Sequence, residues 1–282
     1  MMGRPDGRKL KNLDYEYPVA AHIMDRRTDA MNMTTLDIPI APIRHYLNEK
    51  RKEGKRYSHL TVIVAAIIRA ISQYPALNRF VVNKRIYARN EIAIGMVVLK
   101  GGKIDAAGTA DKMKFEPTNT IDDVDRIISD YVEKNRSEDD VNGTDRVAKR
   151  LVSTPGLLRV GVSFMKWLDK HNRMPKAVVE ISPFHCTMML TNLASIKTDY
   201  VFHHAYDFGT VSLTLALGKL REVPMIHKGE VVLEKCMPMG LVMDERIASG
   251  AYFAMAFRAF RKYLEDPHVL ETPPEKIVED DG

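Results

Sequence analysis

The stretch whose residue types most suggest chemistry lies near the C-terminus, where residues 241–260 read LVMDERIASGAYFAMAFRAF. An apolar run typical of a buried strand leads into the polar segment Asp244-Glu245-Arg246-Ile247-Ala248-Ser249-Gly250, and a helix rich in small residues is predicted to follow. Three consecutive charged residues between a buried strand and a packed helix need a reason, because a charge is costly to bury without a partner. This segment is the first candidate for a functional site.

A second candidate is His185-Cys186 in SPFHCT, which could suggest a Cys–His nucleophile pair. We predict a strand here, and adjacent residues on a strand point to opposite faces, so the pair is poorly placed for proton transfer. Cys186 and Cys236 form neither a disulfide framework nor a zinc-binding spacing. We therefore expect two free thiols, no metal site and a cytoplasmic location.

Length and composition favour a compact domain with a substantial core, since the chain has 282 residues, 45% of them hydrophobic. No run of about 18 apolar residues occurs, so we expect no membrane span and no membrane partner. The N-terminus is basic but has no apolar stretch behind it, which argues against a signal peptide.

The net charge of +5 and the pI of about 9.0 could favour an anionic ligand, such as a phosphorylated cofactor, or nucleic acid. The basic residues are spread along the chain, and the densest run, NEKRKEGKR (48–56), is predicted to be a solvated loop. No helix-turn-helix, zinc-finger or aromatic RNA-binding signature is present, so no nucleic-acid partner is expected.

The elements predicted in the first half are a strand over 31–41 and helices over 42–54 and from Ser58 to Tyr74-Pro75. Pro42 is placed at the start of the first helix and Gly54 beyond its end. Residues 79–99 predict a β-hairpin with its turn at Asn83-Lys84 and then another strand, which Gly101-Gly102 close. Residues 118–135 predict an amphipathic helix capped by Thr120.

In the second half we expect a loop over 136–143 and a helical stretch from Thr144 to Lys170 with a break at Pro155-Gly156. Strands are predicted for KAVVEIS, CTMMLTNL, TVSLTLALG and VVLEKCMPMGLVM, in a sheet covered on both faces. The last helix, about 250–264, is expected to pack closely through Ala251, Ala254, Ala256 and Ala259. We expect a single domain over 1–282, with an N-terminal arm over about 1–15 and a polar, fraying C-terminal tail over about 266–282.

Several of these stretches resemble the catalytic cores of the dihydrolipoyl acyltransferases of 2-oxoacid dehydrogenase complexes. YPALNRFVVNKRIYARNEIAIGMVVL is similar to an early stretch of those cores, and TNLAS is similar to their Ser-Asn-Leu-Gly segment. ALGKLREVPMIHKGEVVLEKCMPMGLVMDERIASGA follows their hairpin, and LEDPHVL resembles their usual ending. The resemblance covers about residues 10–271, is strongest over 187–271 and is weakest over 136–180, a segment longer than the family's usual helical connection.

The resemblance implies an α+β fold of the chloramphenicol acetyltransferase type, a two-layer mixed β-sheet with packed helices, assembled as a homotrimer. It implies an active site at each seam between two subunits, with coenzyme A or acyl-CoA entering from one side and the acyl acceptor from the other. The family's lipoyl and subunit-binding domains are not expected in this sequence. Residues that bind the cofactor cannot be assigned, and the long 136–180 segment could cover the acceptor channel.

The family's catalytic loop reads Asp-His-Arg-x-x-Asp-Gly, and this chain departs from it at the two positions that carry chemistry. Asp244, Arg246 and Gly250 match the motif, whereas Glu245 stands in place of the general-base histidine and Ser249 in place of the second aspartate.

A glutamate is the weaker base, because a thiol near pKa 8.5 lies about 2 units above a histidine and about 4 units above a glutamate. The transfer is about 3 kcal/mol more uphill for glutamate, unless burial at a seam raises its pKa. The alternative to a tuned base is a carboxylate paired with Arg246 or with a neighbouring subunit.

Three further residues bear on the chemistry that the resemblance implies. Thr191 aligns with the family's oxyanion-donating serine, and its hydroxyl can still donate, although a strand-end role is equally open. His203 and His204 in FHHAYDFG could replace the missing base, but their spacing does not reproduce the motif and a hydrogen-bonded loop histidine is favoured.

Two functions follow for a member of the coenzyme A-dependent acyltransferase class. In the first, the protein still transfers an acyl group, with Glu245 or a loop histidine as base and Thr191 as oxyanion donor. In the second, transfer is lost, and the protein is a pseudoenzyme that binds acyl-CoA or acts as a scaffold beside a protein partner. The residues favour the second.

Overall fold

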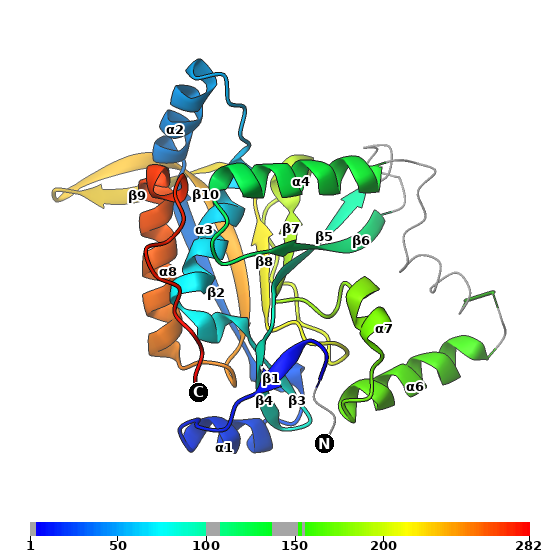
Figure 1. The fold of residues 1–282 in the computed structure, drawn as a ribbon. Helices are drawn as coiled ribbons and strands as arrows, with labels where there is room; N and C mark the ends of the chain where they lie inside the picture. The colour runs from blue at the N-terminus through cyan, green and yellow to red at the C-terminus, as the bar shows by residue number, and fades with distance from the viewer. Residues whose placement is uncertain (1–3, 100–107, 137–151, 154–155) are drawn as a thin grey trace.

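The computed structural model describes residues 4–99, 108–136, 152–153 and 156–282 (Figure 1). The predicted closing glycines Gly101-Gly102, most of the predicted 136–143 loop and residues 144–151 of the predicted helical stretch lie outside these ranges. The described strands are β1 (Gly7–Lys9), β2 (Met31–Pro39), β3 (Arg79–Val82), β4 (Arg85–Arg89), β5 (Ile92–Leu99), β6 (Gly108–Phe115), β7 (Met188–Asn192), β8 (Leu213–Leu217), β9 (Arg221–His227) and β10 (Glu230–Asp244).

The described α-helices are α1 (Glu16–Ile23), α2 (Ala41–Lys52), α3 (His59–Gln73), α4 (Ile121–Arg136), α6 (Leu157–Lys170), α7 (Lys176–Ile181) and α8 (Gly250–Glu265). Short 3-10 turns occupy Arg27–Ala30, Pro75–Asn78, Leu193–Ile196 and Pro267–Leu270.

A seven-stranded mixed sheet forms the framework, in the order β2-β10-β8-β7-β5-β6, with β9 paired to the outer half of β10. The strands β5, β7 and β8 run parallel to one another, and the remaining pairs in this sheet are antiparallel. A smaller sheet, β1-β4-β3, lies at one end of the molecule (Figure 1). This confirms the expected α+β architecture of a mixed sheet layered with helices.

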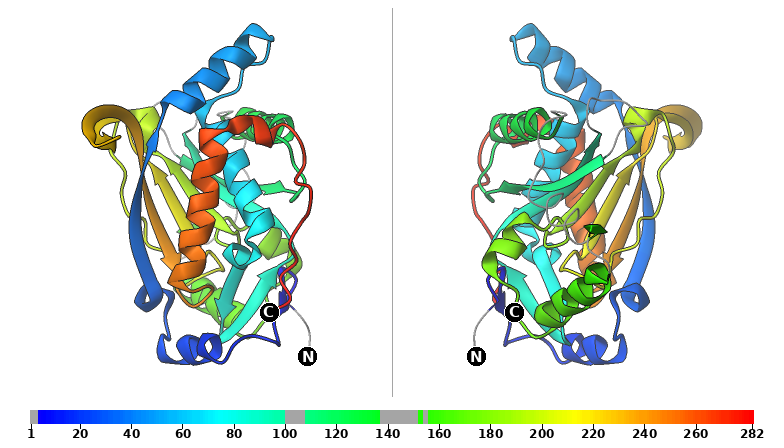
Figure 2. Two further views of the ribbon diagram at one scale, coloured as in Figure 1. Left: turned by 90° about the vertical axis from the view of Figure 1, so that its left-hand side faces the viewer. Right: turned by 90° about the vertical axis from the view of Figure 1, so that its right-hand side faces the viewer.

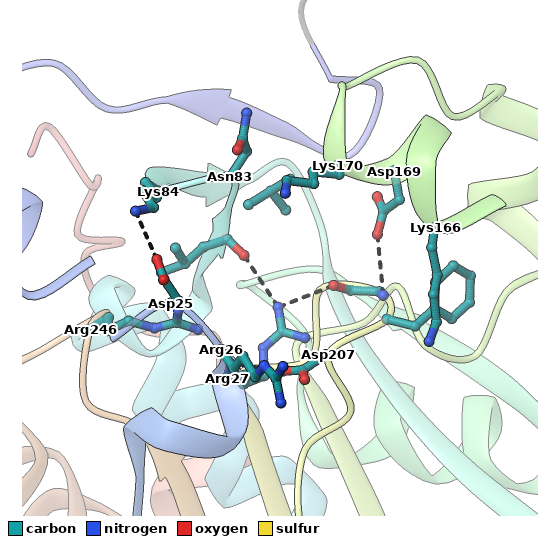
Figure 3. A pocket seen from close by; sticks show the side chains of 14 residues that line it. Asp25, Arg26, Arg27, Asn83, Lys84, Lys166, Asp169, Lys170, Asp207 and Arg246 are labelled. Atoms are coloured by element: carbon teal, nitrogen blue, oxygen red, sulfur yellow. Dashed lines mark hydrogen bonds and ion pairs between the residues drawn. The ribbon is translucent and has the colours of Figure 1, made fainter. Parts of the chain in front are cut away.

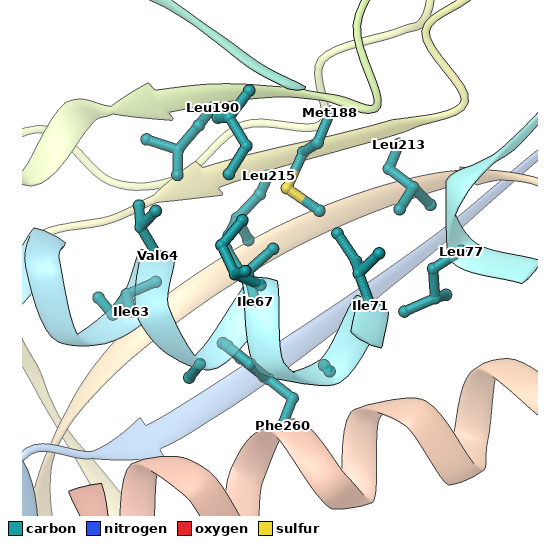
Figure 4. Close-up of a cluster of buried hydrophobic side chains, with 14 of the residues drawn as sticks. Ile63, Val64, Ile67, Ile71, Leu77, Met188, Leu190, Leu213, Leu215 and Phe260 are labelled. Atoms are coloured by element: carbon teal, nitrogen blue, oxygen red, sulfur yellow. The ribbon is translucent and has the colours of Figure 1, made fainter. Parts of the chain in front are cut away.

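Helix α3 is the centre of the core. Ser58 caps it as predicted, accepting a hydrogen bond from Thr61 N while the Thr61 side chain bonds back to Ser58 N. Its apolar residues face β7 and β8 on one side and Phe260 of α8 on the other (Figure 4). Helices α3, α4 and α8 therefore cover one face of the sheet (Figure 2).

The other face is crossed by the extended segment 199–205. Thr214 of β8 donates a hydrogen bond to His203 O at 2.6 Å. Gly240 of β10 lies so close to this segment that a Cβ atom would come within 2.7 Å of both Tyr200 and the Val201 carbonyl oxygen. The central strands are thus buried on both faces, which explains their continuous apolar sequence.

The β3–β4 hairpin confirms the predicted turn. Asn83 and Lys84 have φ values of 47° and 62°, the left-handed conformation that a two-residue hairpin requires at both positions. Thr120 also caps α4 as predicted, since its hydroxyl and the Asp123 carboxylate exchange hydrogen bonds with each other's backbone N–H groups.

The prediction of a strand for KAVVEIS is wrong, because residues 176–181 form the short helix α7 after Pro175. The hydrogen bonds from Val178 N and Val179 N to Pro175 O start the helical turn, and among its residues only Val179 is buried. A short apolar run with two valines fits a strand and a helix equally well by periodicity, so the sequence could not distinguish them.

The expected close packing through alanines in α8 is also wrong. Among those four alanines only Ala256 is buried, and the helix packs through Phe253, Phe260 and Leu264. The alanines at the other positions are exposed or half-buried: Ala251, Ala254 and Ala259.

The C-terminal tail does not fray. It runs back along α3, where Val278 N donates to Ser72 O at 3.0 Å and Arg69 donates to the Val269 carbonyl oxygen at 2.9 Å. Asp280 forms a buried two-bond ion pair with Arg79 of β3, at 2.6 and 2.7 Å. The polar composition that suggested fraying instead supplies specific hydrogen-bond partners.

Candidate functional site

The segment Asp244–Gly250 begins with a buried ion pair. Arg246 Nε donates to Asp244 Oδ1 at 2.8 Å, and Arg246 Nη2 donates to Asp244 Oδ2 at 2.7 Å. Both side chains are almost completely inaccessible, with exposures of 0% for Asp244 and 4% for Arg246. A two-bond pair of this kind fixes the backbone between the two residues, and so fixes the position of residue 245.

A second arginine, Arg27, supports the same carboxylate. Its Nε lies 3.6 Å from Asp244 Oδ2, and its terminal nitrogens donate to the carbonyl oxygens of Val81, Tyr206 and Gly209. Burial lowers the pKa of Arg27, and the neighbouring Asp244 opposes this shift. Arg27 thus ties the segment to the small sheet and to the loop before β8.

Glu245 points away from this buried pair. Its side chain is exposed and accepts a hydrogen bond from Asn32 Nδ2 of β2 at 2.7 Å, while its backbone N donates to Ala30 O. The expected pairing of Glu245 with Arg246 is wrong, because both hydrogen bonds that the Arg246 side chain donates to a carboxylate, from Nε and Nη2, go to Asp244. A contact between Glu245 and a neighbouring subunit stays a prediction.

Ser249 is the N-cap of α8. Its hydroxyl oxygen accepts a hydrogen bond from Tyr252 N at 3.3 Å, and Gly250 is the first helical residue. Ser249 is therefore occupied with ending the loop and starting the helix. Both positions at which the chain departs from the family's loop, 245 and 249, lie on its exposed side.

Thr191 is the next-to-last residue of β7 and is half-buried. It pairs with Ala216 of β8, and Ala216 pairs with Gly240 of β10, five residues before Glu245. At strand spacings, Thr191 and Glu245 are about 16 Å apart along the strands and about 10 Å apart across them. The structure does not bring these two candidate residues together within one chain.

The histidine pair lies nearer to the loop than Thr191 does. Ala205 N contacts the Met31 sulfur at 3.2 Å, and Met31 is the strand partner of Asp244. Both His203 and His204 are exposed, and the ring of His204 packs edge-on against Tyr206.

His185 and Cys186 are not a catalytic pair. His185 Nδ1 lies 2.8 Å from Ser182 Oγ and its Nε2 lies 3.4 Å from Asp169 Oδ1, whereas Cys186 Sγ faces Met188 O and the Met189 sulfur. They lie in a turn before β7 rather than in a strand, but they do face apart. Burial raises the pKa of the Cys186 thiol, which keeps it protonated and unreactive.

Asp169 connects this turn to the N-terminal arm. Burial alone would raise the pKa of Asp169, but the His185 ring and the Arg4 guanidinium, 2.8 Å away, hold it well below its usual range. Arg4 also forms a two-bond pair with Asp6. A chain of buried charges therefore extends from β1 to the end of α6, beside the candidate loop.

A cationic pocket of about 540 Å³ opens between the loop and α6 (Figure 3). Lys166, Asp169 and Lys170 enter it from α6, and Lys84 enters from the β3–β4 turn. Its cationic lining residues, which outnumber the acidic ones, are Arg26, Arg27, Lys84, Lys166, Lys170 and Arg246. Such a pocket favours an anionic ligand.

Across the described residues, no group of three or more His, Cys, Asp or Glu side chains is arranged to hold a metal ion. No helix in the described ranges is long and apolar enough to span a membrane.

The family model described as 2-oxoacid dehydrogenases acyltransferase (catalytic domain) matches residues 187–271. This region contains Thr191 and the whole candidate loop. The search of curated protein sequences found no match.

The same family appears among solved structures of similar fold. A probable dihydrolipoamide acetyltransferase from Listeria monocytogenes is 12% identical, with a TM-score of 0.57 over 92% of this chain and 95% of that one. A chloramphenicol acetyltransferase is 10% identical, with a TM-score of 0.55 over 92% and 99%. The fold is therefore the acyltransferase-core fold shared by these proteins.

A third similar structure is the dihydrolipoamide acetyltransferase of Azotobacter vinelandii, 11% identical, with a TM-score of 0.59 over 96% of this chain and 93% of that one. In its catalytic mechanism the roles of a serine, a histidine and an asparagine were investigated.

Sequence reasoning missed two residues that position the loop. Arg27 gave no signal, because its partners Val81, Gly209 and Asp244 are remote in sequence and two of them are backbone carbonyls. Asn32 gave no signal either, because it is one of several polar residues in a predicted strand. The lysines of α6 could have been suspected, since Lys166 and Lys170 lie one helical turn apart on one face.

Proposed function

We propose that this protein is an acyl-CoA-binding relative of the dihydrolipoyl acyltransferases that assembles as a homotrimer and has lost histidine-dependent acyl transfer. Each binding site lies at the seam between two chains. One chain supplies Thr191, and its neighbour supplies the loop with Glu245 and Ser249.

The observation that carries this proposal is the separation of Thr191 and Glu245 by at least about 16 Å within one chain. A nucleophile or oxyanion donor must lie within hydrogen-bond reach of the reacting atoms. A single chain cannot meet this condition with these residues, whereas a symmetric trimer offers each loop a second chain.

The loss of transfer follows from the two altered positions. A solvated carboxylate that accepts a hydrogen bond from Asn32 is a poor base for a thiol. When neither pKa is perturbed, proton transfer from a thiol is about 3 kcal/mol more uphill to glutamate than to histidine. Ser249, the other altered residue, caps α8. The buried Asp244–Arg246 pair keeps the loop in shape without requiring that it act in catalysis.

Coenzyme A is the ligand that fits both the resemblance and the charge. Its phosphates match the cations that line the pocket beside the loop, especially Lys166 and Lys170. The net charge of +5 adds a general attraction for such an anion.

The test is isothermal titration with coenzyme A and with acetyl-CoA, followed by a thiol-release assay on the same sample. The proposal expects binding without turnover, and binding that weakens about tenfold in Lys166→Gln, the size of one lost charge-assisted hydrogen bond. Lys52→Gln on the distant helix α2 is the matched control. Binding by neither ligand would overturn the proposal and leave only the fold in common.

A second candidate function is rewired transfer with Glu245 as base. It is favoured by one observation, that the loop is intact and presents Glu245 at the surface, where a neighbouring chain could bury it. Burial raises the pKa of a carboxylate and makes it a stronger base. This function predicts turnover that Glu245→Gln abolishes; turnover lost instead in His203→Ala or His204→Ala would assign the base to the loop histidines.

A further inference from the structure

Two helices at the same end of the molecule expose apolar side chains to solvent. On the outer face of α6, Val160, Phe164 and Trp167 are 67%, 57% and 44% exposed, and the rings of Phe164 and Trp167 stack. They follow the helical spacing i, i+4, i+7, and therefore form one stripe. The opposite side of α6, with Asp169, faces the protein.

Helix α1 and the residue before it repeat this arrangement. Tyr15, Val19 and Ile23 are 85%, 51% and 76% exposed, at i, i+4 and i+8. Figure 1 shows α1 and α6 at the same end of the molecule, on either side of the small sheet β1-β4-β3. The two helices that carry the stripes therefore flank the small sheet.

The surface between the stripes is cationic. One hollow of about 890 Å³ is lined by residues of β1, the β3–β4 hairpin and the end of α6, and a second hollow adjoins α1. No aspartate or glutamate lines either of them. The exposed or half-exposed cations in these linings are Arg8, Lys9, Lys11, Lys84, Arg85, Lys170 and Arg173. Lys84 is paired with Asp25 at 2.7 Å.

Cations also flank the α6 stripe itself. Arg159 and Lys166 lie beside it on the helix, and Arg173 places its guanidinium 5.6 Å from the centre of the Trp167 ring. A helix with tryptophan and phenylalanine on one side and lysine and arginine beside them is the arrangement that lies flat in the interface of an anionic membrane. Its long basic side chains can reach the headgroups while the rings enter the apolar layer.

We propose that this end of the molecule docks on the surface of an anionic lipid bilayer, with the α1 and α6 stripes in the interface and the cations between them on the headgroups. The charge decides between a bilayer and a second copy of the chain. A two-fold contact would place these cations against the same cations, which is repulsive, and a head-to-tail contact would bring them to another face of a chain whose net charge is +5. An anionic lipid surface instead offers them a charge of opposite sign.

This docking requires no membrane-spanning helix. Its surface shares Lys84, Lys166 and Lys170 with the proposed acyl-CoA site, so the substitutions that test it lie outside the lining of that pocket. The expectation of no membrane partner rested on the lack of a long apolar run, which excludes a span but not a helix that lies in the interface.

The chain contains one tryptophan, Trp167, so its intrinsic tryptophan fluorescence reports on this stripe alone. We expect the emission of the full chain to shift to shorter wavelength on vesicles of phosphatidylcholine mixed with phosphatidylserine, and the protein to sediment with them. Pure phosphatidylcholine vesicles should give neither effect, and added salt should weaken both.

Substitutions separate the contribution of the apolar side chains to vesicle binding from that of the cations. We expect Phe164→Ser to lower partitioning about tenfold, the effect of withholding one aromatic side chain from the apolar layer. Arg159→Gln and Arg173→Gln should each lower it about fivefold. The matched controls, Leu233→Ser on the exposed β9–β10 hairpin and Lys52→Gln on α2, should partition like the parent chain.

Four outcomes would overturn the proposal. They are no sedimentation with the anionic vesicles, equal binding to pure phosphatidylcholine, an equal loss in the control variants, and a change of oligomeric state in Phe164→Ser seen by sedimentation velocity. The last outcome would assign the stripe to a contact between copies of the chain. All four leave the test of acyl-CoA binding unaffected.

Discussion

The two ends of the central strands differ in how they are held. At the end of β10, Asp244, Arg246 and Arg27 form a buried cluster with almost no solvent access. At the end of β7, Thr191 is half-buried and is followed by the short 3-10 turn Leu193–Ile196, in which no residue is buried. One end is rigid without a partner chain, and the other presents an open surface.

This difference shows which half of the candidate site the single chain completes. The buried ion pairs fix the loop's backbone but leave Glu245 and Ser249 at the surface. Thr191 lies at the opposite end, on a surface that a second chain can cover. The comparison therefore assigns structural roles to the buried residues and supports the proposal that the site is divided between chains.

The largest expected effect tests the rigid end. Asp244→Ala leaves Arg246 and Arg27 buried without their carboxylate, and we expect it to lower the free energy of unfolding by about 3–5 kcal/mol. Thr191→Ala should cost less than about 1 kcal/mol, because it removes one hydroxyl and one methyl from a half-exposed side chain. Urea unfolding of both variants measures the difference. If both substitutions lowered the free energy of unfolding equally, the two ends of the central strands would not differ in how they are held.

Acid should lower the stability that the buried charges beside the candidate loop contribute, and Asp169 is the group to test. The pKa of Asp169 is below its usual range in the folded chain, so the stability it contributes is present above pH 4 or so. That stability is lost as the pH falls from about 4 toward the lower folded-state value, by at most about 1.4 kcal/mol per pH unit.

Unfolding free energies measured between pH 7 and pH 3 check this dependence. Asp169→Asn removes the titrating group, so its stability should fall less steeply in acid than that of the parent chain. A variant with the same slope as the parent would show that Asp169 is not one of the groups responsible.

A smaller effect tests the exposed side of the loop. Ser249→Ala removes the N-cap of α8, and we expect a loss of about 1 kcal/mol in unfolding free energy. Ser249→Asp, which restores the residue type of the family's motif, keeps an N-cap and should retain most of that stability. Thermal unfolding compares the two. If the alanine variant were as stable as the aspartate variant, Ser249 would not act as a cap.

Most of the fold could be predicted from local signals. The helix α3 has strong periodicity and a cap at Ser58, and the β3–β4 turn has residues that accept positive φ. The segment α7 and the C-terminal tail could not be predicted. The valines of α7 fit a strand and a helix equally well. The tail is fixed by the Arg79–Asp280 pair, whose members are 201 residues apart in sequence.

The candidate site was predictable in its positions but not in its contacts. The resemblance located Glu245 and Ser249. The order of charges suggested Arg246 or a neighbouring subunit as the partner of Glu245, and within the chain the structure has Asn32 instead. The adjacent residue Asp244 takes both bonds from Arg246 because its carboxylate is buried beside the guanidinium, whereas the carboxylate of Glu245 is exposed. Sequence gives the order of charges along a loop, and the fold decides which of them are buried together.

The central claim, that the site is divided between chains, is tested most directly by cross-linking Thr191→Cys/Glu245→Cys with a short thiol-reactive linker. The native cysteines, Cys186 and Cys236, are both buried and should not react. The account predicts cross-links only between chains, giving a covalent trimer on a denaturing gel, and none in either single variant. A cross-link within one chain, or no cross-link in the assembled protein, would contradict it.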